Sequence, residues 1–135
     1  MKLCDLSKYN KITIQCHDNP DADTIASGFG VYTYLKEHKK NVRIVYGGTN
    51  VIRRSNLVTM INELEIPIEH VRNVKKEEEA ELLITVDCQY GEGNVSPYPA
   101  KNIAIIDHHR VDKELPKLSR VESDLGACAT LVWEM

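Results

Sequence analysis

The sequence predicts an α/β fold in which a mostly parallel β-sheet is flanked by helices on both faces. Strongly apolar runs with many β-branched residues alternate along the chain with longer segments whose apolar positions recur every three or four residues. The apolar runs contain few polar positions, which is typical of strands buried on both faces. With 135 residues, the chain has the length of one domain with a single core.

The first half of the chain contains two predicted strand–helix pairs. Residues 11–16 are rich in β-branched side chains and form the first strand. Residues 23–39 form a helix, because their apolar positions have helical spacing and basic residues gather near their end. Residues 42–46 form a second strand that ends at two glycines, and a second helix follows from about residue 50 to residue 64.

The second half adds the central strands. A short strand is predicted near residues 70–74, and the charge run at residues 75–79 carries both signs, so we expect a solvated loop or helix face there. Residues 82–86 and 103–106 form two central strands. Between them, the glycines and prolines of residues 90–99 indicate a loop or a short helix with turns.

The end of the chain resembles an unfinished element. Residues 125–135 have the pattern of the start of an amphipathic helix, and no capping signal precedes the last residue. We therefore expect residues 1–135 to be a single domain that is cut short at its C-terminal end.

The composition excludes some classes of function. The formal net charge of −3 offers no basic surface for tight nonspecific binding of nucleic acid. A small anionic substrate is compatible with this charge, because metal ions would supply local positive charge. The chain has no signal peptide and no long apolar segment, so we expect a cytoplasmic protein without a membrane partner.

The cysteines indicate a reducing compartment. They are Cys4, Cys16, Cys88 and Cys128, and no two of them form a Cys-x-x-Cys pair. Cys16 and Cys88 lie inside predicted strands, and we expect them to be buried, reduced thiols. A thiolate zinc site is disfavoured, because the histidines group with aspartates instead.

Metal-competent side chains follow three of the predicted strands. These residues are His17, Asp21 and Asp23 after the first strand, Asp87 after residues 82–86, and Asp107, His108 and His109 after residues 103–106. Because the carboxyl ends of parallel strands meet at one edge of a sheet, we expect these side chains to converge. Carboxylates with a minority of imidazoles suit Mn²⁺ or Mg²⁺.

The three clusters can be divided between two ions. His17 and Asp21 could hold one ion and Asp23 the other, with His108 completing the second site. Asp87 stands alone between the two clusters, so we expect it to bridge the ions.

The chemistry expected of such a centre is metal-assisted phosphoester hydrolysis. His109 could contact the substrate phosphate or protonate the leaving oxygen, and Asp107 could orient an imidazole.

Each residue also has a purely structural interpretation. Asp21 and Asp23 could cap a helix N-terminus, and Asp87 could be a strand-end turn residue. A histidine taken alone at position 108 or 109 would more often be a core residue than a ligand. We favour the metal interpretation because three separate strand ends carry aspartate and two of them carry histidine. His38 and His70 are expected to be a helix-end residue and a loop residue.

These motifs resemble those of the DHH phosphoesterase family. The resemblance rests on segments 17–23, 86–87 and 107–109, and on the small residues and threonine at 126–130. It implies a Rossmann-like catalytic domain with two Mn²⁺ ions. One ion would be held by His17, Asp21 and Asp87, the other by Asp23, Asp87 and His108, with His109 near the substrate phosphate.

The resemblance extends to a subgroup related to oligoribonucleases that also act on 3′-phosphoadenosine-5′-phosphate. It implies a short oligonucleotide or nucleotide phosphate as substrate, and we expect that a homodimer could form. Two departures matter. Ala22 stands where the family often has glycine, and a further aspartate and a C-terminal substrate-binding domain are expected beyond Met135.

Two alternatives stay open. A manganese-dependent inorganic pyrophosphatase or exopolyphosphatase would carry the same three motifs. A noncatalytic module that binds metal or nucleotide would suit a chain that ends before the expected further aspartate.

Overall fold

The computed structural model describes residues 1–74, 79–96 and 98–135. Apart from Glu79, the predicted charge run therefore lies outside the described residues. In chain order the elements are α1 (Leu3–Leu6), β1 (Lys11–Cys16), α2 (Ala22–Glu37), β2 (Asn41–Tyr46), α3 (Ser55–Glu63), β3 (Ile68–His70), the 3-10 helix η1 (Val71–Asn73), β4 (Ala80–Val86), β5 (Ala100–Asp107), β6 (Leu118–Val121) and α4 (Cys128–Glu134).

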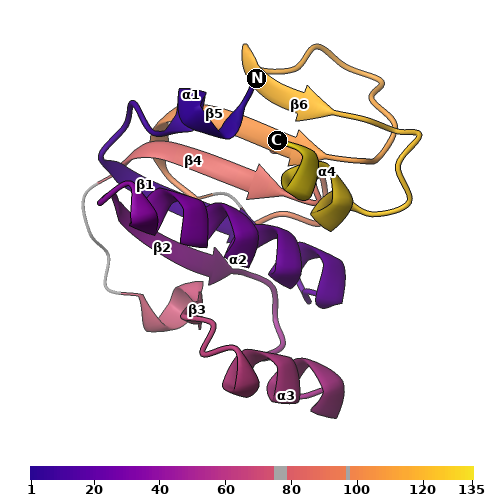
Figure 1. The fold of residues 1–135 in the computed structure, drawn as a ribbon. Coiled ribbons are helices and arrows are strands. Elements are labelled where there is room, and N and C mark those ends of the chain that lie inside the picture. The colour runs from indigo at the N-terminus through magenta and orange to yellow at the C-terminus, as the bar shows by residue number, and fades with distance from the viewer. Residues whose placement is uncertain (75–78, 97) are drawn as a thin grey trace.

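The described strands form a six-stranded parallel sheet in the order β3-β2-β1-β4-β5-β6 (Figure 1). This arrangement confirms the predicted α/β class. The chain adds strands outward from β1 to β3 and then places β4 on the other side of β1. The order of strands reverses between β1 and β4, and in parallel sheets ligands bind outside the carboxyl ends of the strands at such a point.

Helix α2 packs closely on one face of the sheet. A Cβ atom on Gly28 of α2 would lie 3.3 Å from Cys16 Sγ and 3.6 Å from Ile14 Cγ2, so the helix and β1 are in contact there. Helices α1 and α4 lie on the same side as α2 (Figure 1). These helices and the sheet enclose one apolar core, which includes Leu57 of α3.

The opposite face of the sheet is also buried. Its covered side chains include Thr13, Gln15, Leu83, Thr85 and Ile105. The connection between β4 and β5 lies against this face, since Gln15 Nε2 donates a hydrogen bond to the carbonyl of Ser96 and Val95 is buried. Right-handed crossovers explain this placement, because β4 to β5 runs in the opposite direction across the sheet from β1 to β2. In the described residues, the segment that covers this face is an irregular connection, as its glycines predict.

Some boundaries differ from the prediction. β3 ends at His70, where it was expected to begin, because the His70 side chain accepts a hydrogen bond from the backbone of Arg72 and the chain turns into η1. α3 begins later than expected, at Ser55, after a segment in which Ile52 N donates to Tyr46 Oη. The short elements α1 and β6 were not predicted.

The turn after β2 supplies a test of the packing. A Cβ atom on Gly47 would lie 2.5 Å from Asp18 Oδ1 and 2.7 Å from Ser96 Cβ. We expect Gly47→Ala to lower the free energy of unfolding by about 1–3 kcal/mol through overpacking, measured by urea denaturation. The control is Gly93→Ala, which should stay within about 0.5 kcal/mol because nothing lies within 4 Å of its added Cβ. Equal stability of the two variants would contradict the packing argument.

Candidate metal centre

The register of the sheet places three predicted site residues in one row. Cys16 of β1, Val86 of β4 and Ile106 of β5 are paired across the sheet. The residues that directly follow them are His17, Asp87 and Asp107. Since neighbouring strands lie about 4.8 Å apart, side chains from these positions can reach a common centre.

His17, Asp21 and Asp87 form the first group of candidate ligands. His17 Nε2 lies 3.7 Å from Asp21 Oδ1 and 3.7 Å from Asp87 Oδ2, and one potential ligand atom from each residue falls within 4.8 Å of the others. His17 Nδ1 lies 2.9 Å from the carbonyl oxygen of Asp18. Because a carbonyl only accepts, Nδ1 carries a proton, and Nε2 is the ring nitrogen that faces the carboxylates and can bind a cation.

Asp87, His108 and His109 form the second group. His108 Nε2 lies 3.2 Å from Asp87 Oδ1, and the three potential ligand atoms again fall within 4.8 Å of one another. His108 Nδ1 lies 2.9 Å from the carbonyl oxygen of Leu125, which fixes its tautomer in the same way. Asp87 belongs to both groups, as a bridging carboxylate must.

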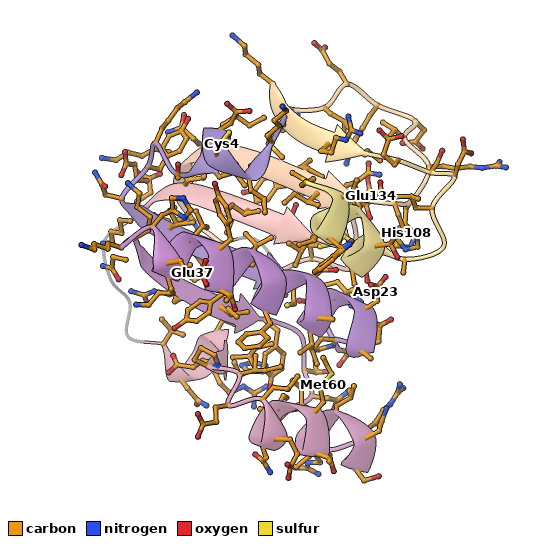
Figure 2. All side chains as sticks on the ribbon, in the orientation of Figure 1. Cys4, Asp23, Glu37, Met60, His108 and Glu134 are labelled. Atoms are coloured by element: carbon orange, nitrogen blue, oxygen red, sulfur yellow. The ribbon has the colours of Figure 1, made fainter. Side chains whose placement is uncertain are left out.

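Asp23 lies beside the second group and also anchors helix α4. Figure 2 shows Asp23 and His108 at the same end of the sheet, and Asp23 Oδ2 lies 3.7 Å from His108 Nε2. The two carboxylate oxygens of Asp23 accept hydrogen bonds of 2.8 Å from the backbone of Cys128 and Ala129. A carboxylate oxygen can accept more than one bond, so this anchoring leaves lone pairs for a cation. The compact group around His108 nevertheless contains His109 and not Asp23.

The loop from His17 to Asp21 is fixed by contacts outside the ligand groups. The carboxylate of Asp18 accepts hydrogen bonds from Ser96 N at 3.2 Å and Ser96 Oγ at 2.7 Å. Asp21 Oδ1 accepts two backbone hydrogen bonds as the N-cap of α2. Asp21 therefore caps the helix and also lies beside His17, so the structural and the metal interpretations of this residue are compatible.

Asp87 carries a buried charge in an unusual position. It has a φ of 59°, a conformation in which few non-glycine residues occur, and its side chain is 3% exposed. Burial raises the pKa of Asp87 to about 6, and the charges of Asp23 and Asp21 act in the same direction. The imidazoles of His17 and His108, when charged, oppose this increase in its pKa.

The surroundings of Asp87 fit a metal ion. Its Oδ1 is buried without a well-formed hydrogen bond to any described residue, although His108 Nε2 lies 3.2 Å away. In the tautomers fixed by the backbone, both His17 and His108 present lone pairs to the carboxylate. Two facing lone pairs at this distance require a proton or a metal ion between them.

The donor set favours divalent ions that bind oxygen and imidazole, such as Mn²⁺ or Mg²⁺. The described thiols near the site do not compete, because burial raises the pKa of Cys16 and of Cys128 to about 12 and keeps them protonated. Their Sγ atoms lie within hydrogen-bonding distance of backbone carbonyls. Cys16 and Cys88 are both buried, as predicted.

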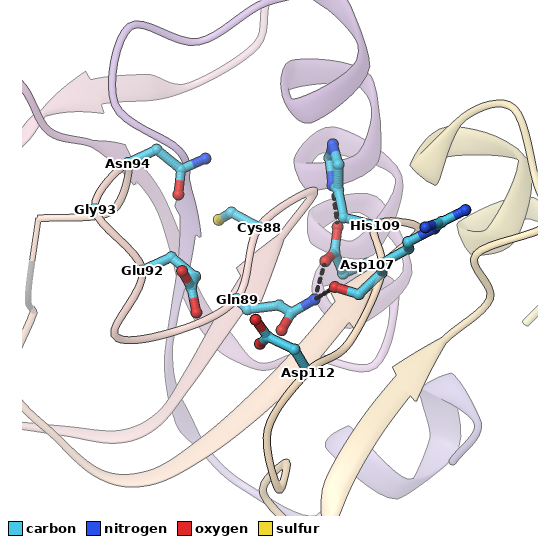
Figure 3. Close-up of a pocket in the computed structure, with 9 residues that line it drawn as sticks. Cys88, Gln89, Glu92, Gly93, Asn94, Asp107, His109 and Asp112 are labelled. Atoms are coloured by element: carbon cyan, nitrogen blue, oxygen red, sulfur yellow. Dashed lines mark hydrogen bonds and ion pairs between the residues drawn. The ribbon is translucent and has the colours of Figure 1, made fainter.

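Gln89, Asp107 and His109 form a hydrogen-bonded chain next to the two ligand groups (Figure 3). The fully buried Asp107 accepts a hydrogen bond of 2.9 Å from Gln89 Nε2, and its other oxygen lies 2.8 Å from His109 Nδ1. The hydrogen bond to Asp107 is the main reason that the pKa of His109 is raised. Nε2 of the exposed His109 ring is then free to donate a proton. Gln89 was not predicted, because in the sequence it is only a polar residue after a strand.

Comparison of the sequence with protein families identifies the family of this chain. The model of the DHH family, N-terminal domain, matches residues 11–135. The chain belongs to the DHH family. The matched range includes Asp107, His108 and His109, which the structure places at the end of β5 and in the turn after it.

Two solved structures share the DHH fold of this chain. An exopolyphosphatase-related protein from Bacteroides fragilis superposes with a TM-score of 0.76 at 18% identity, over 98% of this chain and 42% of that chain. RecJ from Thermus thermophilus, in complex with Mn²⁺, superposes with a TM-score of 0.52 at 16% identity, over 96% of this chain and 18% of that chain. This chain thus spans less than half of either protein.

Among curated proteins, none matches the chain. No helix within the described residues has the length and apolar character needed to cross a membrane. The predicted cytoplasmic location and the predicted homodimer stay predictions.

The buried charge of Asp87 predicts a trade-off between stability and metal binding. The pKa of Asp87 in the folded chain, about 6, exceeds its ordinary value of 3.8, so the folded state loses stability as the pH rises through this interval. Asp87→Asn removes the charge, and asparagine tolerates a positive φ. In EDTA above pH 6, the variant should be more stable than the wild type, by at most about 3 kcal/mol. The difference should vanish toward pH 4.

This prediction is checked by urea denaturation across that pH interval. Addition of Mn²⁺ should stabilise the wild type and leave Asp87→Asn nearly unchanged. The exposed Asp124 supplies the control variant Asp124→Asn, which should change stability by less than about 0.5 kcal/mol at every pH. A metal-free Asp87→Asn variant that is less stable than the wild type at pH 8 would contradict the argument.

The hydrogen bond between Asp107 and His109 predicts a shift that NMR can measure. Because this bond holds the pKa of His109 above its ordinary value, Asp107→Asn should lower that pKa. The ring of His109 would then lose its proton at a lower pH than in the wild type. Titration of the imidazole resonances in EDTA measures this directly, and the exposed His38 supplies an internal control. If the pKa of His109 is unchanged in Asp107→Asn, the proposal that Asp107 positions His109 is wrong.

Proposed function

We propose that this chain is the catalytic domain of a phosphoesterase that hydrolyses short oligonucleotides or 3′-phosphoadenosine-5′-phosphate with two Mn²⁺ ions. The observation that carries the proposal is the pair of candidate ligand groups that share Asp87. Membership of the DHH family supports phosphoester chemistry. The choice of Mn²⁺ is supported by the donor set and by the similarity to RecJ, whose structure contains Mn²⁺.

The residues of the chain have distinct parts in this proposal. His17, Asp21 and Asp87 would hold one ion, and Asp87 and His108, with Asp23 beside them, would hold the other. When bound, the ions would supply Lewis acidity toward the phosphoryl group and lower the pKa of water.

Proton transfer to the leaving oxygen falls to His109 in this proposal. Its Nδ1–H donates to Asp107, which leaves the Nε2 proton of the charged ring for the leaving oxygen. Gln89 donates to both Asp107 and the backbone of Arg110, so the carboxylate keeps its orientation. Asp107 and Gln89 are therefore positioning residues, and His109 is the catalytic acid.

A second candidate function is hydrolysis of inorganic pyrophosphate or polyphosphate. The observation that favours it is the fold shared with an exopolyphosphatase-related protein along nearly the whole of this chain. The ligand groups described above would serve this reaction equally well, because both reactions transfer a phosphoryl group to water.

A substrate panel with Mn²⁺ tests the proposed function. We expect His108→Ala to reduce hydrolysis of a short oligoribonucleotide or 3′-phosphoadenosine-5′-phosphate at least about 100-fold, as expected on loss of a metal ligand. The control is His38→Ala, on the exposed end of α2, which should retain full activity. Turnover of polyphosphate or pyrophosphate without turnover of nucleotides would favour the second candidate. Tight binding of Mn²⁺ without any turnover would favour the noncatalytic module.

A further inference from the structure

A cavity of about 520 Å³ lies beside the candidate metal centre, at the carboxyl ends of β2 and β3. We call it the arginine pocket, because Arg53, Arg54 and Arg72 line it. Among the residues that the structure describes, none that lines it is an aspartate or a glutamate. The pocket thus concentrates positive charge in a chain whose formal net charge is −3.

Two of these arginines have no partner among the described residues. The guanidinium groups of Arg53 and Arg54 have no hydrogen bond or ion pair with any residue that the structure describes, and both side chains are exposed. Arg54 is the N-cap residue of α3 but makes no side-chain capping bond, and the first turn of α3 contains no acidic residue. Free guanidinium groups next to uncapped amides favour an anion with several oxygens, such as phosphate.

The wall of the pocket is held in place by side-chain contacts. His70 Nε2 lies 3.0 Å from the carbonyl oxygen of Gly48, and Arg72 Nη2 donates a hydrogen bond of 2.9 Å to the carbonyl of Thr49. The rings of Tyr46 and His70 meet edge to face, with centroids 4.9 Å apart. The buried His70, expected to be a loop residue, therefore joins β3 to the turn after β2 and positions Arg72.

The arginine pocket shares a wall with the loop that carries the metal ligands. Asn19 and Pro20 line the pocket, and these residues lie between His17 and Asp21 in the sequence. Asn50 also lines the pocket, and its Nδ2 donates a hydrogen bond of 3.3 Å to Asn19 Oδ1. The ends of β2 and β3 lie one and two strands away from β1, about 5–10 Å.

The second cavity near the site has the opposite character. It measures about 400 Å³ and lies on the other side, around His109 (Figure 3). Glu92, Asp107 and Asp112 line it, opposed by Arg110 and the His109 ring. A phosphate would meet net negative charge there, whereas the charged side chains described in the arginine pocket are all arginines.

We propose that the arginine pocket binds a second phosphate group of the substrate while the phosphate to be hydrolysed lies at the metal centre. This inference rests on the proposed function and narrows it to substrates with at least two phosphate groups. Both a polyphosphate chain and a nucleotide with two phosphates meet this requirement. The pocket therefore selects for phosphate number and takes no part in the chemical step.

Binding without metal tests the pocket apart from catalysis. We expect tripolyphosphate to bind the wild-type chain in EDTA at low salt, measured by calorimetry, and Arg53→Ala/Arg54→Ala to weaken this binding at least about 10-fold. The matched control is Arg120→Ala, which removes an exposed arginine that pairs with Glu122 on β6. Equal binding by the wild type and the double variant would overturn the proposal, even if the chain hydrolyses phosphoesters.

Kinetics with Mn²⁺ distinguishes the two sources of the second phosphate. The double variant should raise KM at least about 10-fold with little change in kcat, because the lost contact lies away from the reacting phosphate. Bis(p-nitrophenyl) phosphate, with a single phosphate, should be hydrolysed equally by the wild type and the variant.

The substrates whose KM rises in the double variant identify the source of the second phosphate. A KM effect with tripolyphosphate alone assigns the pocket to inorganic chains, and one with a 5′-phosphorylated dinucleotide alone assigns it to nucleotides. The proposal would be overturned if the double variant raised KM as much for the single-phosphate substrate as for the others. It would also be overturned if KM changed for none of the substrates. If no substrate is hydrolysed, the proposed function fails while the metal-free binding experiment still decides the role of the pocket.

Discussion

Asp87 must hold its carboxylate nearly out of contact with water, at the end of a central strand and in a left-handed backbone conformation. A structural aspartate in such a place would be surrounded by donors. Around Asp87 the nearest polar groups are instead imidazole nitrogens whose other ring nitrogens face backbone carbonyls. The arrangement is unfavourable for a charged carboxylate without a cation and favourable for a carboxylate that shares cations.

The neighbouring aspartates join the site to the fold. Asp21 caps α2, and Asp23 accepts two amide hydrogen bonds at the start of α4, so each carboxylate is oriented by a helix terminus. The second of these contacts spans more than a hundred residues of sequence and forms only when α4 has docked. Side-chain rotation is thereby restricted before any ion binds, and assembly of the site is coupled to completion of the core.

Much of this could be predicted from the sequence because each ligand directly follows an apolar run, and parallel strands bring such positions to one edge. The predicted residues His17, Asp21, Asp23, Asp87 and His108 lie together for this reason. Contacts that depend on irregular segments could not be predicted. The bonds from Ser96 to Asp18 and from Gln89 to Asp107 join loops whose paths no periodicity specifies. The edge strand β6 is short and half-buried, so it lacks the apolar run that revealed β4 and β5.

The net charge of −3 conceals a separation of charge across the loop from His17 to Asp21. On one side lie the carboxylates of the metal centre, which repel a phosphate until cations have bound. On the other side lies the arginine pocket, which under our proposal attracts phosphate without any cation. The hydrogen bond between Asn50 and Asn19 and those between Ser96 and Asp18 hold the loop from both sides. Under our proposal, the protein thereby sets the spacing between an anion in the pocket and a phosphate at the candidate metal centre, and this spacing determines which substrate lengths fit.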